Sequence, residues 1–287
     1  MTGGTLFVLP EGNLIRTQRY LAISFLIFAA ATVSLHAQQQ NSQAREHQTL
    51  EPVDPSLYSA MRWRLIGPYR AGRVSAVAGI PGDPAVYYMG TPGGGVWKTS
   101  SAGRVWKPIF DDQHVASIGA VAIAPSNPNI VYVGTGEQTD GNGMYKSVDA
   151  GATWTNIGLS DVHYINSIIV DPHDPNILVV GALGHPILSV AAASPWRGIF
   201  KSTDGGKNWT KTLYRDDFAG AADTVADPNN PRVLFTAVWK PFDFFSGPPD
   251  VRKVDSWIYK SEDEGATWKE LPTTGLPADE PLGRIGL

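Results

Sequence analysis

The chain of 287 residues contains no cysteine and carries few charges. The absence of cysteine excludes a disulfide scaffold and a thiolate metal site. Charged residues make up 17% of the sequence, against about 25% in an average soluble domain. The net charge of -4 does not favour a nucleic-acid partner, which would need a basic surface.

Turn-forming and aromatic residues are abundant instead. The sequence holds 30 Gly, 22 Pro and 9 Trp, and 43% of its residues are hydrophobic, which excludes a disordered chain. Gly and Pro mark turns, and the body of the sequence lacks helical periodicity. These features predict a large all-β body of short strands with one repeated aromatic position.

The N-terminus has the pattern of a targeting segment. Basic residues precede the uncharged apolar run 21–35, and the small residue Ala37 follows it. This order predicts a secretory signal peptide over 1–37, with an uncleaved signal anchor as the alternative. The polar segment 38–60 is a predicted linker. We therefore expect an exported protein, secreted, periplasmic or at the cell surface, that meets a membrane only through an uncleaved anchor.

One ten-residue pattern recurs along the chain: aromatic-Lys-Ser/Thr-x-Asp-x-Gly-x-x-Trp. It occupies 145–154, 200–209 and 259–268, and a weakened copy covers 97–106 with Ser101 in place of the Asp. A repeat of this length and spacing indicates an architecture built from similar units.

A second marker keeps phase with the repeat. An Asp-Pro or Asn-Pro dipeptide precedes a β-rich run in each unit, and such a dipeptide predicts a turn before a strand. Each unit then has four short strands, which in the second unit we expect at about 117–124, 130–135, 143–148 and 153–158. Four strands per unit, repeated, are typical of β-propeller blades. The dipeptides are Asp83-Pro84, Asn127-Pro128, Asp174-Pro175 and Asn230-Pro231.

The Asp-x-Gly segment is the predicted turn between the third and fourth strands. We expect the Asp to accept backbone N–H groups two residues on, the Gly to supply a positive φ, and the Trp to pack on the neighbouring blade. Because the pattern occurs once per blade, it favours a structural role over catalysis or Ca²⁺ binding. The predicted structural residues are Ser147, Asp149, Gly151, Trp154, Ser202, Asp204, Gly206, Trp209, Ser261, Asp263, Gly265 and Trp268.

The two ends of the repeat region predict an incomplete ring. Segment 63–68 is similar to a fourth strand, and 282–286 is similar to 71–75, a predicted first strand. The predicted fold over 61–287 is all-β, a propeller of four complete four-stranded antiparallel blades plus an orphan N-terminal outer strand and a C-terminal inner strand. We expect the chain to be the front part of a longer propeller, truncated at its C-terminus.

The repeat resembles the Asp-box (BNR) repeats of sialidases, xyloglucanase-type glycoside hydrolases, photosystem II assembly-factor propellers and the sortilin N-terminal domain. Segments 63–68, 93–98 and 282–285 are more narrowly similar to large exported bacterial proteins labelled sortilin-like or BNR-repeat glycosyl hydrolases. Over 61–287 the resemblance implies a propeller that binds or scaffolds a protein, peptide or glycan. The alternative that it implies is a glycoside hydrolase acting on an extracellular polysaccharide.

Two enzyme motifs of these families are altered here. The sialidase motif Phe/Tyr-Arg-Ile-Pro is broken, since Tyr69-Arg70 is followed by Ala71-Gly72. Xyloglucanases carry a catalytic base in Thr-Asp-Ile-Gly-Gly, and the matching segment 91–95 has Pro92 at the Asp position. A glycosidase needs two acids that face one sugar bond, so these departures favour binding over hydrolysis.

The connections between second and third strands lengthen along the chain, through 91–95, 136–143, 184–198 and 240–256. Long connections in a compact domain are more often functional, and these open opposite the Asp-x-Gly turns. Their aromatics suit a carbohydrate or peptide ligand, or else cover the tops of the blades. The predicted ligand-binding residues are Trp196, Arg197, Phe244 and Phe245 of these connections, together with His163 and Asp217, which we expect on the same face from the connections between blades.

Three acids are candidates for catalysis. Asp223 stands within a predicted inner strand, where a solvated channel residue is the alternative, and Glu137 and Asp140 stand in a long connection. His163 and His173 lie on different predicted elements without a ligand spacing, so we expect no metal site. We also expect no cofactor, because 91–95 opens a strand and not a helix as a phosphate-binding loop would.

Overall fold

A computed structural model describes residue 54 and residues 72–185, 192–241, 255–272, 274–275 and 282–287. The chain divides into the units Met1–Pro68 and Tyr69–Leu287, and every strand among the described residues belongs to the second. Within the described ranges no helix is long and apolar enough to cross a membrane. The predicted signal peptide and the orphan strand 63–68 lie outside these ranges, as does the predicted linker apart from Asp54.

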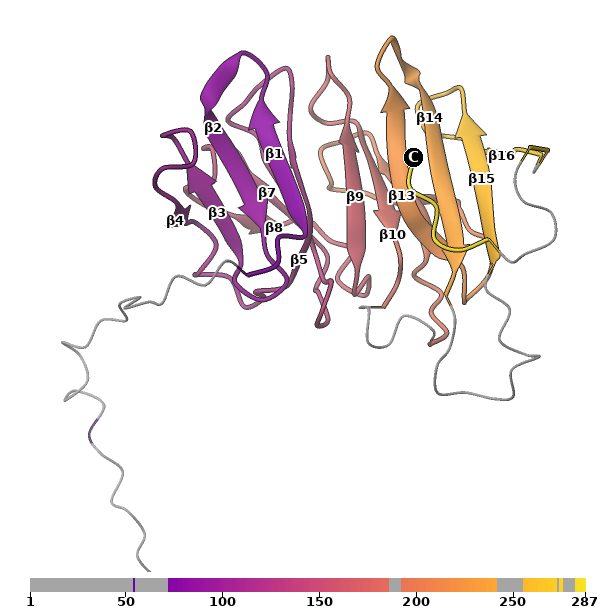
Figure 1. The fold of residues 1–287 in the computed structure, drawn as a ribbon, viewed down its shortest axis with the longest axis horizontal. Coiled ribbons are helices and arrows are strands. Elements are labelled where there is room, and N and C mark those ends of the chain that lie inside the picture. Colours follow the sequence, from indigo (N-terminus) through magenta and orange to yellow (C-terminus); the bar gives the residue numbers. More distant parts are fainter. Residues whose placement is uncertain (1–53, 55–71, 186–191, 242–254, 273, 276–281) are drawn as a thin grey trace, which may run out of the picture. The chain divides into compact units, whose positions relative to one another are not determined.

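The fold is all-β over the described residues, as predicted, with four antiparallel sheets of four strands each (Figure 1). Each sheet runs in chain order, so each is one predicted blade. The first strands are β1 (Ala76–Ile80), β5 (Ile118–Ile123), β9 (Ile165–Val170) and β13 (Gly220–Asp227). The second strands are β2 (Asp83–Gly90), β6 (Val131–Thr135), β10 (Leu178–Ala182) and β14 (Asn230–Lys240).

The outer half of each sheet is shorter. The third strands are β3 (Val96–Thr99), β7 (Met144–Ser147), β11 (Gly198–Ser202) and β15 (Asp255–Ser261). The fourth strands are β4 (Lys107–Pro108), β8 (Thr155–Asn156), β12 (Thr210–Leu213) and β16 (Lys269–Glu270). The four strands of the second sheet fall within the predicted ranges, which confirms the strand count drawn from the repeat.

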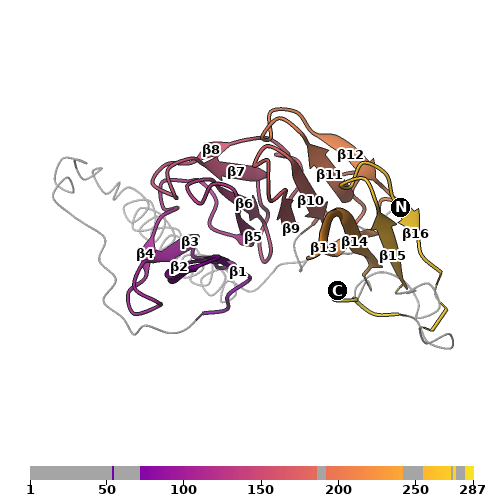
Figure 2. The same cartoon turned by 90° about the horizontal axis from the view of Figure 1, so that it is seen from above.

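The first strands of successive sheets lie next to one another, and Figure 2 shows the sheets following in chain order along an arc. Glycines of the second strands allow this approach. A Cβ at Gly90 would lie 2.5 Å from Cγ2 of Ile118, and one at Gly134 would lie 2.4 Å from Cγ2 of Ile165. Since both isoleucines belong to the next sheet, the spacing between sheets depends on these glycines.

The hydrophobic core consists of separate clusters between neighbouring sheets. Tyr88 and Phe110 of the first sheet pack with Val131 and Val133 of the second. Other clusters join the second sheet to the third and the third to the fourth. The second strands of the two middle sheets, β6 and β10, therefore pack on both faces, and both are buried along their whole length.

The Asp-x-Gly segments form the predicted turns between third and fourth strands, with one change in their hydrogen bonds. Asp149 Oδ1 accepts the N–H of Thr153 at 2.8 Å, four residues on, so the prediction of two residues on was wrong. The N–H two residues on, that of Gly151, donates instead to Ser147 Oγ at 2.8 Å. Gly151 has φ 90°, as predicted. We call the eight-residue motif 147–154 and its copies at 202–209 and 261–268 the Asp-box turns.

The repeated Trp joins each blade to the preceding one. Trp154 Nε1 donates to Ile109 O at 2.7 Å, and Trp209 Nε1 donates to Ile157 O at 2.8 Å. Trp154 also meets Phe110 edge to face, with 5.2 Å between ring centroids. The prediction of packing on a neighbouring blade is therefore confirmed at both positions.

Strand ends differ from the sequence prediction in two respects. Pro84 and Pro231 fall inside β2 and β14, yet neither has a ladder partner, because the register shifts beside them. Residues 282–287 form no strand, although they lie beside β13, where Arg284 donates to Ala222 O at 3.1 Å. A strand needs a ladder of backbone pairs, and this segment forms none with another described strand.

Candidate functional site

The sheet ends opposite the Asp-box turns, which we call the loop face, hold the connections between second and third strands and those between sheets. Backbone hydrogen bonds tie three of these connections together. Gly141 N donates to His163 O at 2.9 Å, and His163 N donates to Gly184 O at 3.1 Å. These hydrogen bonds fix the β6–β7, β8–β9 and β10–β11 connections relative to one another.

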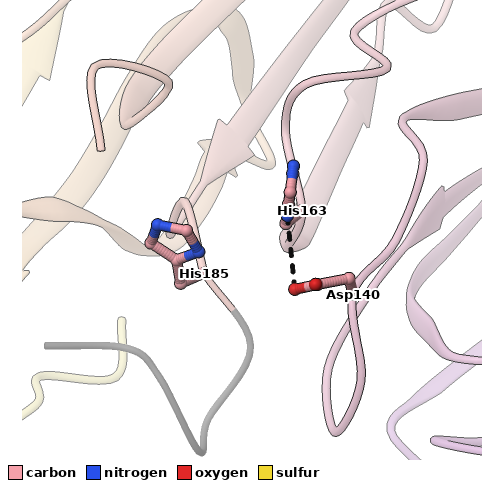
Figure 3. Close-up of side chains that lie close together, drawn as sticks. All are labelled: Asp140, His163 and His185. Atoms are coloured by element: carbon pink, nitrogen blue, oxygen red, sulfur yellow. Dashed lines mark ion pairs between the residues drawn. The ribbon is translucent and has the colours of Figure 1, made fainter. Parts of the chain in front are cut away.

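Three side chains from these connections gather into a cluster of Asp140, His163 and His185 (Figure 3). Their ligand-type atoms all lie within 4.8 Å of one another. His163 Nδ1 is 3.2 Å from Asp140 Oδ1, and the two imidazole centroids are 5.5 Å apart. Asp140 and His163 were predicted separately as a catalytic and a ligand-contacting residue, and the structure brings them together with a third residue that the sequence did not single out.

His185 is held by its backbone neighbours. Its Nε2 lies 3.3 Å from Ala193 O, close enough for the ring to donate a hydrogen bond. Burial lowers the pKa of His185 most strongly, and the nearby Arg197 and His163 lower it further. A neutral imidazole with one nitrogen engaged leaves the other as a lone-pair donor.

Glu137 is a buried carboxylate that forms a two-pronged ion pair. Both guanidinium nitrogens of Arg73 donate to it, each at 2.6 Å, and only 5% of its side chain is exposed. Its backbone N–H donates to Ser117 Oγ at 3.0 Å. Because both carboxylate oxygens are engaged, this geometry suits the anchoring of the β6–β7 connection better than proton transfer.

Asp223, the third candidate acid, lies in the inner strand β13 as predicted, beside a register shift. Its Oδ1 accepts the N–H of Thr224 at 2.9 Å, and its Oδ2 accepts the N–H of Leu287 at 3.0 Å. The carboxylate is half-buried and bound by backbone donors. It does not belong to the cluster around His163.

Arg197 was predicted to contact a ligand, but its side chain is completely buried. Its guanidinium donates to the carbonyl oxygens of Leu183, Ala192 and Asp217, the last at 2.8 Å. Burial lowers its pKa to about 10, while Asp216 and Asp217 act in the opposite direction. Arg197 therefore holds the β10–β11 connection against the segment before β13.

Trp196 is exposed, as expected for a ligand-contacting residue, with 40% of its surface accessible. Lys211 Nζ lies 5.7 Å from the centroid of its ring and 4.7 Å from that of the exposed Tyr214. The Tyr214 hydroxyl donates to Asp217 Oδ1 at 2.6 Å. These residues form an aromatic surface with polar groups at its edge, which we call the Trp196–Tyr214 surface.

The predicted residues Phe244 and Phe245 lie outside the described residues. Sequence reasoning missed His185, Arg73 and Tyr214. Arg73 pairs with an acid of the next blade, and no pattern of neighbouring residues in the sequence indicates this pairing. His185 was visible as a residue of a long connection, but its partners are 22 or more positions away.

No protein-family model matches the chain. It is similar to a xyloglucanase of Paenibacillus sp, with 28% identity over 214 residues that cover 64% of this chain and 20% of the relative. It is also similar to the xyloglucanase Xgh74A of Acetivibrio thermocellus, with 26% identity over 208 residues, 62% of this chain and 23% of the relative. The chain thus spans about a fifth to a quarter of the length of these curated relatives.

Solved structures of GH74 enzymes have a similar fold. That of the Niastella koreensis GH74 enzyme gives a TM-score of 0.53 at 21% identity, covering 68% of this chain and 29% of the enzyme. That of the GH74 xyloglucanase of Xanthomonas campestris gives 0.53 at 20% identity, with coverage of 75% and 32%. The chain therefore has the blade architecture of a β-propeller, and its relatives in sequence are xyloglucanases rather than sortilins.

Proposed function

We propose that the chain is part of an exported glycoside hydrolase that acts on an extracellular polysaccharide of the xyloglucan type. The single observation that carries this proposal is the sequence similarity to curated xyloglucanases across the blades. Export is inferred from the N-terminal pattern of basic residues, apolar run and small residue.

Within this proposal, the described blades contribute a glycan-binding surface. The exposed ring of Trp196 offers an apolar face to a sugar, and Tyr214, Lys211 and Asp217 offer polar partners to its hydroxyls. The position of the surface on the loop face, where the connections are long, supports this assignment.

A second function, a binding or scaffold propeller of the sortilin-like type for a protein, peptide or glycan, is favoured by one specific observation. Pro92 stands where xyloglucanases carry the acid of Thr-Asp-Ile-Gly-Gly, and Glu137 is held by Arg73. Neither of these two positions therefore offers the free acid that a two-acid mechanism needs.

Titration of the 287-residue chain with xyloglucan oligosaccharides, together with an assay for released reducing ends, tests the proposal. We expect Trp196→Ala to weaken oligosaccharide binding by about tenfold, as the loss of an aromatic anchor does. Tyr87→Ala is the matched control, because Tyr87 is also 40% exposed but lies in the first sheet. Equal oligosaccharide binding by the wild type and both variants would contradict the surface, and release of reducing ends would count against the second function.

A further inference from the structure

The Asp140–His163–His185 cluster has the composition of a transition-metal site. Two imidazoles and one carboxylate are ligands that Zn²⁺ and its neighbours in the first row prefer, whereas Ca²⁺ and Mg²⁺ prefer oxygen atoms alone. The three residues come from three different connections, so their convergence is a product of the fold (Figure 3).

The contact between His163 and Asp140 fits two ligands of one ion. The separation of 3.2 Å between Nδ1 and Oδ1 corresponds to an angle of roughly 100° at an ion placed about 2.05 Å from each atom, close to a tetrahedral angle. His163 Nδ1 is also buried without a hydrogen-bond partner, so the short contact does not have the geometry of a hydrogen bond. An ion would satisfy this buried nitrogen.

His185 has the outer partner that a ligating imidazole usually has. When its Nε2–H donates to Ala193 O, the tautomer leaves the lone pair on Nδ1. Two ligands at a tetrahedral angle around one Zn²⁺ lie about 3.3 Å apart, so a separation as wide as 4.8 Å needs a shift of about 1.5 Å by the His185 side chain.

The surroundings leave the cluster ready for an ion. Hydrogen bonds from Gly141 N to His163 O and from His163 N to Gly184 O fix the backbones that carry all three ligands. Arg197, the nearby cation, directs its guanidinium to the carbonyl oxygens of Leu183, Ala192 and Asp217. The Asp140 carboxylate supplies the negative charge that a dication needs.

We propose that Asp140, His163 and His185 bind one Zn²⁺-type divalent ion on the loop face. Three protein ligands leave a fourth coordination position for water or a ligand oxygen. The bound ion links the β6–β7, β8–β9 and β10–β11 connections and so clamps the second and third sheets together at this face. This inference is independent of the proposed function.

The test is calorimetric titration of the metal-free, tag-free 287-residue chain with ZnCl₂, with metal content measured after dialysis. We expect one Zn²⁺ per chain. Removing an outer-shell partner of a metal ligand costs about 10- to 100-fold in affinity, and His163→Ala should lose more Zn²⁺ affinity than that. The matched control is His173→Ala, because His173 also faces an aspartate, Asp171 at 3.7 Å, but has no third ligand.

Thermal unfolding gives a second readout. A Zn²⁺ concentration 100-fold above the dissociation constant should raise the Tm of the wild type and of His173→Ala by roughly 5–10 °C. The Tm of His185→Gln should stay unchanged. Near-ultraviolet circular dichroism establishes that each variant is folded. A wild-type chain that retains no Zn²⁺, or one whose affinity falls equally in His163→Ala and His173→Ala, would overturn the proposal and leave a His–Asp ion pair.

Discussion

The two ends of the blades differ in how closely their structure is repeated from one blade to the next. At the Asp-box turns, the Ser hydroxyl donates to the Asp carboxylate at 2.7, 2.9 and 2.8 Å in the second, third and fourth sheets. At the loop face the connection of the second sheet has a salt-bridged glutamate, whereas that of the third has an exposed Trp. The repeated end holds the blades together, whereas the variable end carries every candidate for binding.

The weakened first copy of the repeat sharpens this comparison. Ser101 replaces the Asp, and its Oγ still accepts the N–H of Val105 at 3.0 Å, four residues on. Thr99 Oγ1 accepts the N–H of Gly103 at 3.1 Å, as Ser147 Oγ accepts that of Gly151. The turn therefore survives the loss of the carboxylate, which shows that the motif needs an oxygen acceptor at this position rather than a charge.

The largest effect should come from Gly136→Ala at the loop face. Gly136 has φ 88°, and a Cβ there would lie 1.7 Å from His163 O. Backbone strain and the clash together should cost about 3 kcal/mol or more of unfolding free energy in urea. Gly93→Ala on the same face is the control, since its Cβ meets nothing within 4 Å. Similar losses in both variants would show that the close approach of the connections is not what matters.

Substitution of two tryptophans, one at each end of the blades, compares the two ends directly. Trp154→Ala removes the hydrogen bond to Ile109 O and the contact with Phe110, and should cost about 2–4 kcal/mol of stability. Trp196→Ala removes an exposed ring and should change stability by no more than about 0.5 kcal/mol. Urea denaturation monitored by circular dichroism measures both. A large loss for Trp196→Ala would mean that the ring stabilises the blade tops instead of contacting a ligand.

Arg73→Ala tests the anchoring of the β6–β7 connection. It leaves the buried Glu137 carboxylate without its ion-pair partner, which should cost roughly 1–3 kcal/mol. The half-exposed position of Arg73 keeps this below the cost for a fully buried pair, because water can replace the guanidinium. Chemical denaturation of Arg73→Ala and of the exposed control Arg104→Ala provides the measurement. Equal stability of the two variants would assign Glu137 a role other than anchoring.

Acid pH should destabilise the Asp-box turns. Hydrogen bonds, chiefly from Thr153, lower the pKa of Asp149 to about 2, and Asp204 and Asp263 also have a pKa of about 2. An unfolded Asp has a pKa of about 3.9, so the folded state binds fewer protons between these values. The stabilisation is present above about pH 4 and is lost as the pH falls toward 2.

Urea denaturation of the wild type and the triple Asp→Asn variant at several pH values from 2 to 5 checks this. The wild type should lose stability more steeply with falling pH than the variant, because the variant lacks the three titrating groups. Parallel pH profiles would show that other carboxylates control acid unfolding. A variant that retains folded blades at pH 5 would agree with the surviving turn at Ser101.

How much of the structure could be predicted from the sequence depends on how far apart the interacting residues lie along the chain. The Asp-box turns are closed by hydrogen bonds between residues two to four positions apart, so the repeat predicted their place and the positive φ of Gly151. The choice of N–H was predicted wrongly, because Ser147 Oγ accepts the N–H of Gly151 and the Asp149 carboxylate accepts that of Thr153. Arg73 and Glu137 are 64 positions apart, and nothing local indicates their pairing.

The sequence by itself determined the all-β class, four blades of four strands and the structural role of the repeated Asp and Trp. These follow from short-range turn chemistry and from a pattern that is copied along the chain. The tertiary structure decided that Arg197 is buried, that Glu137 is salt-bridged and that Asp140, His163 and His185 meet. Such contacts depend on how neighbouring blades pack, because blade packing sets the distances between connections that are far apart in the chain.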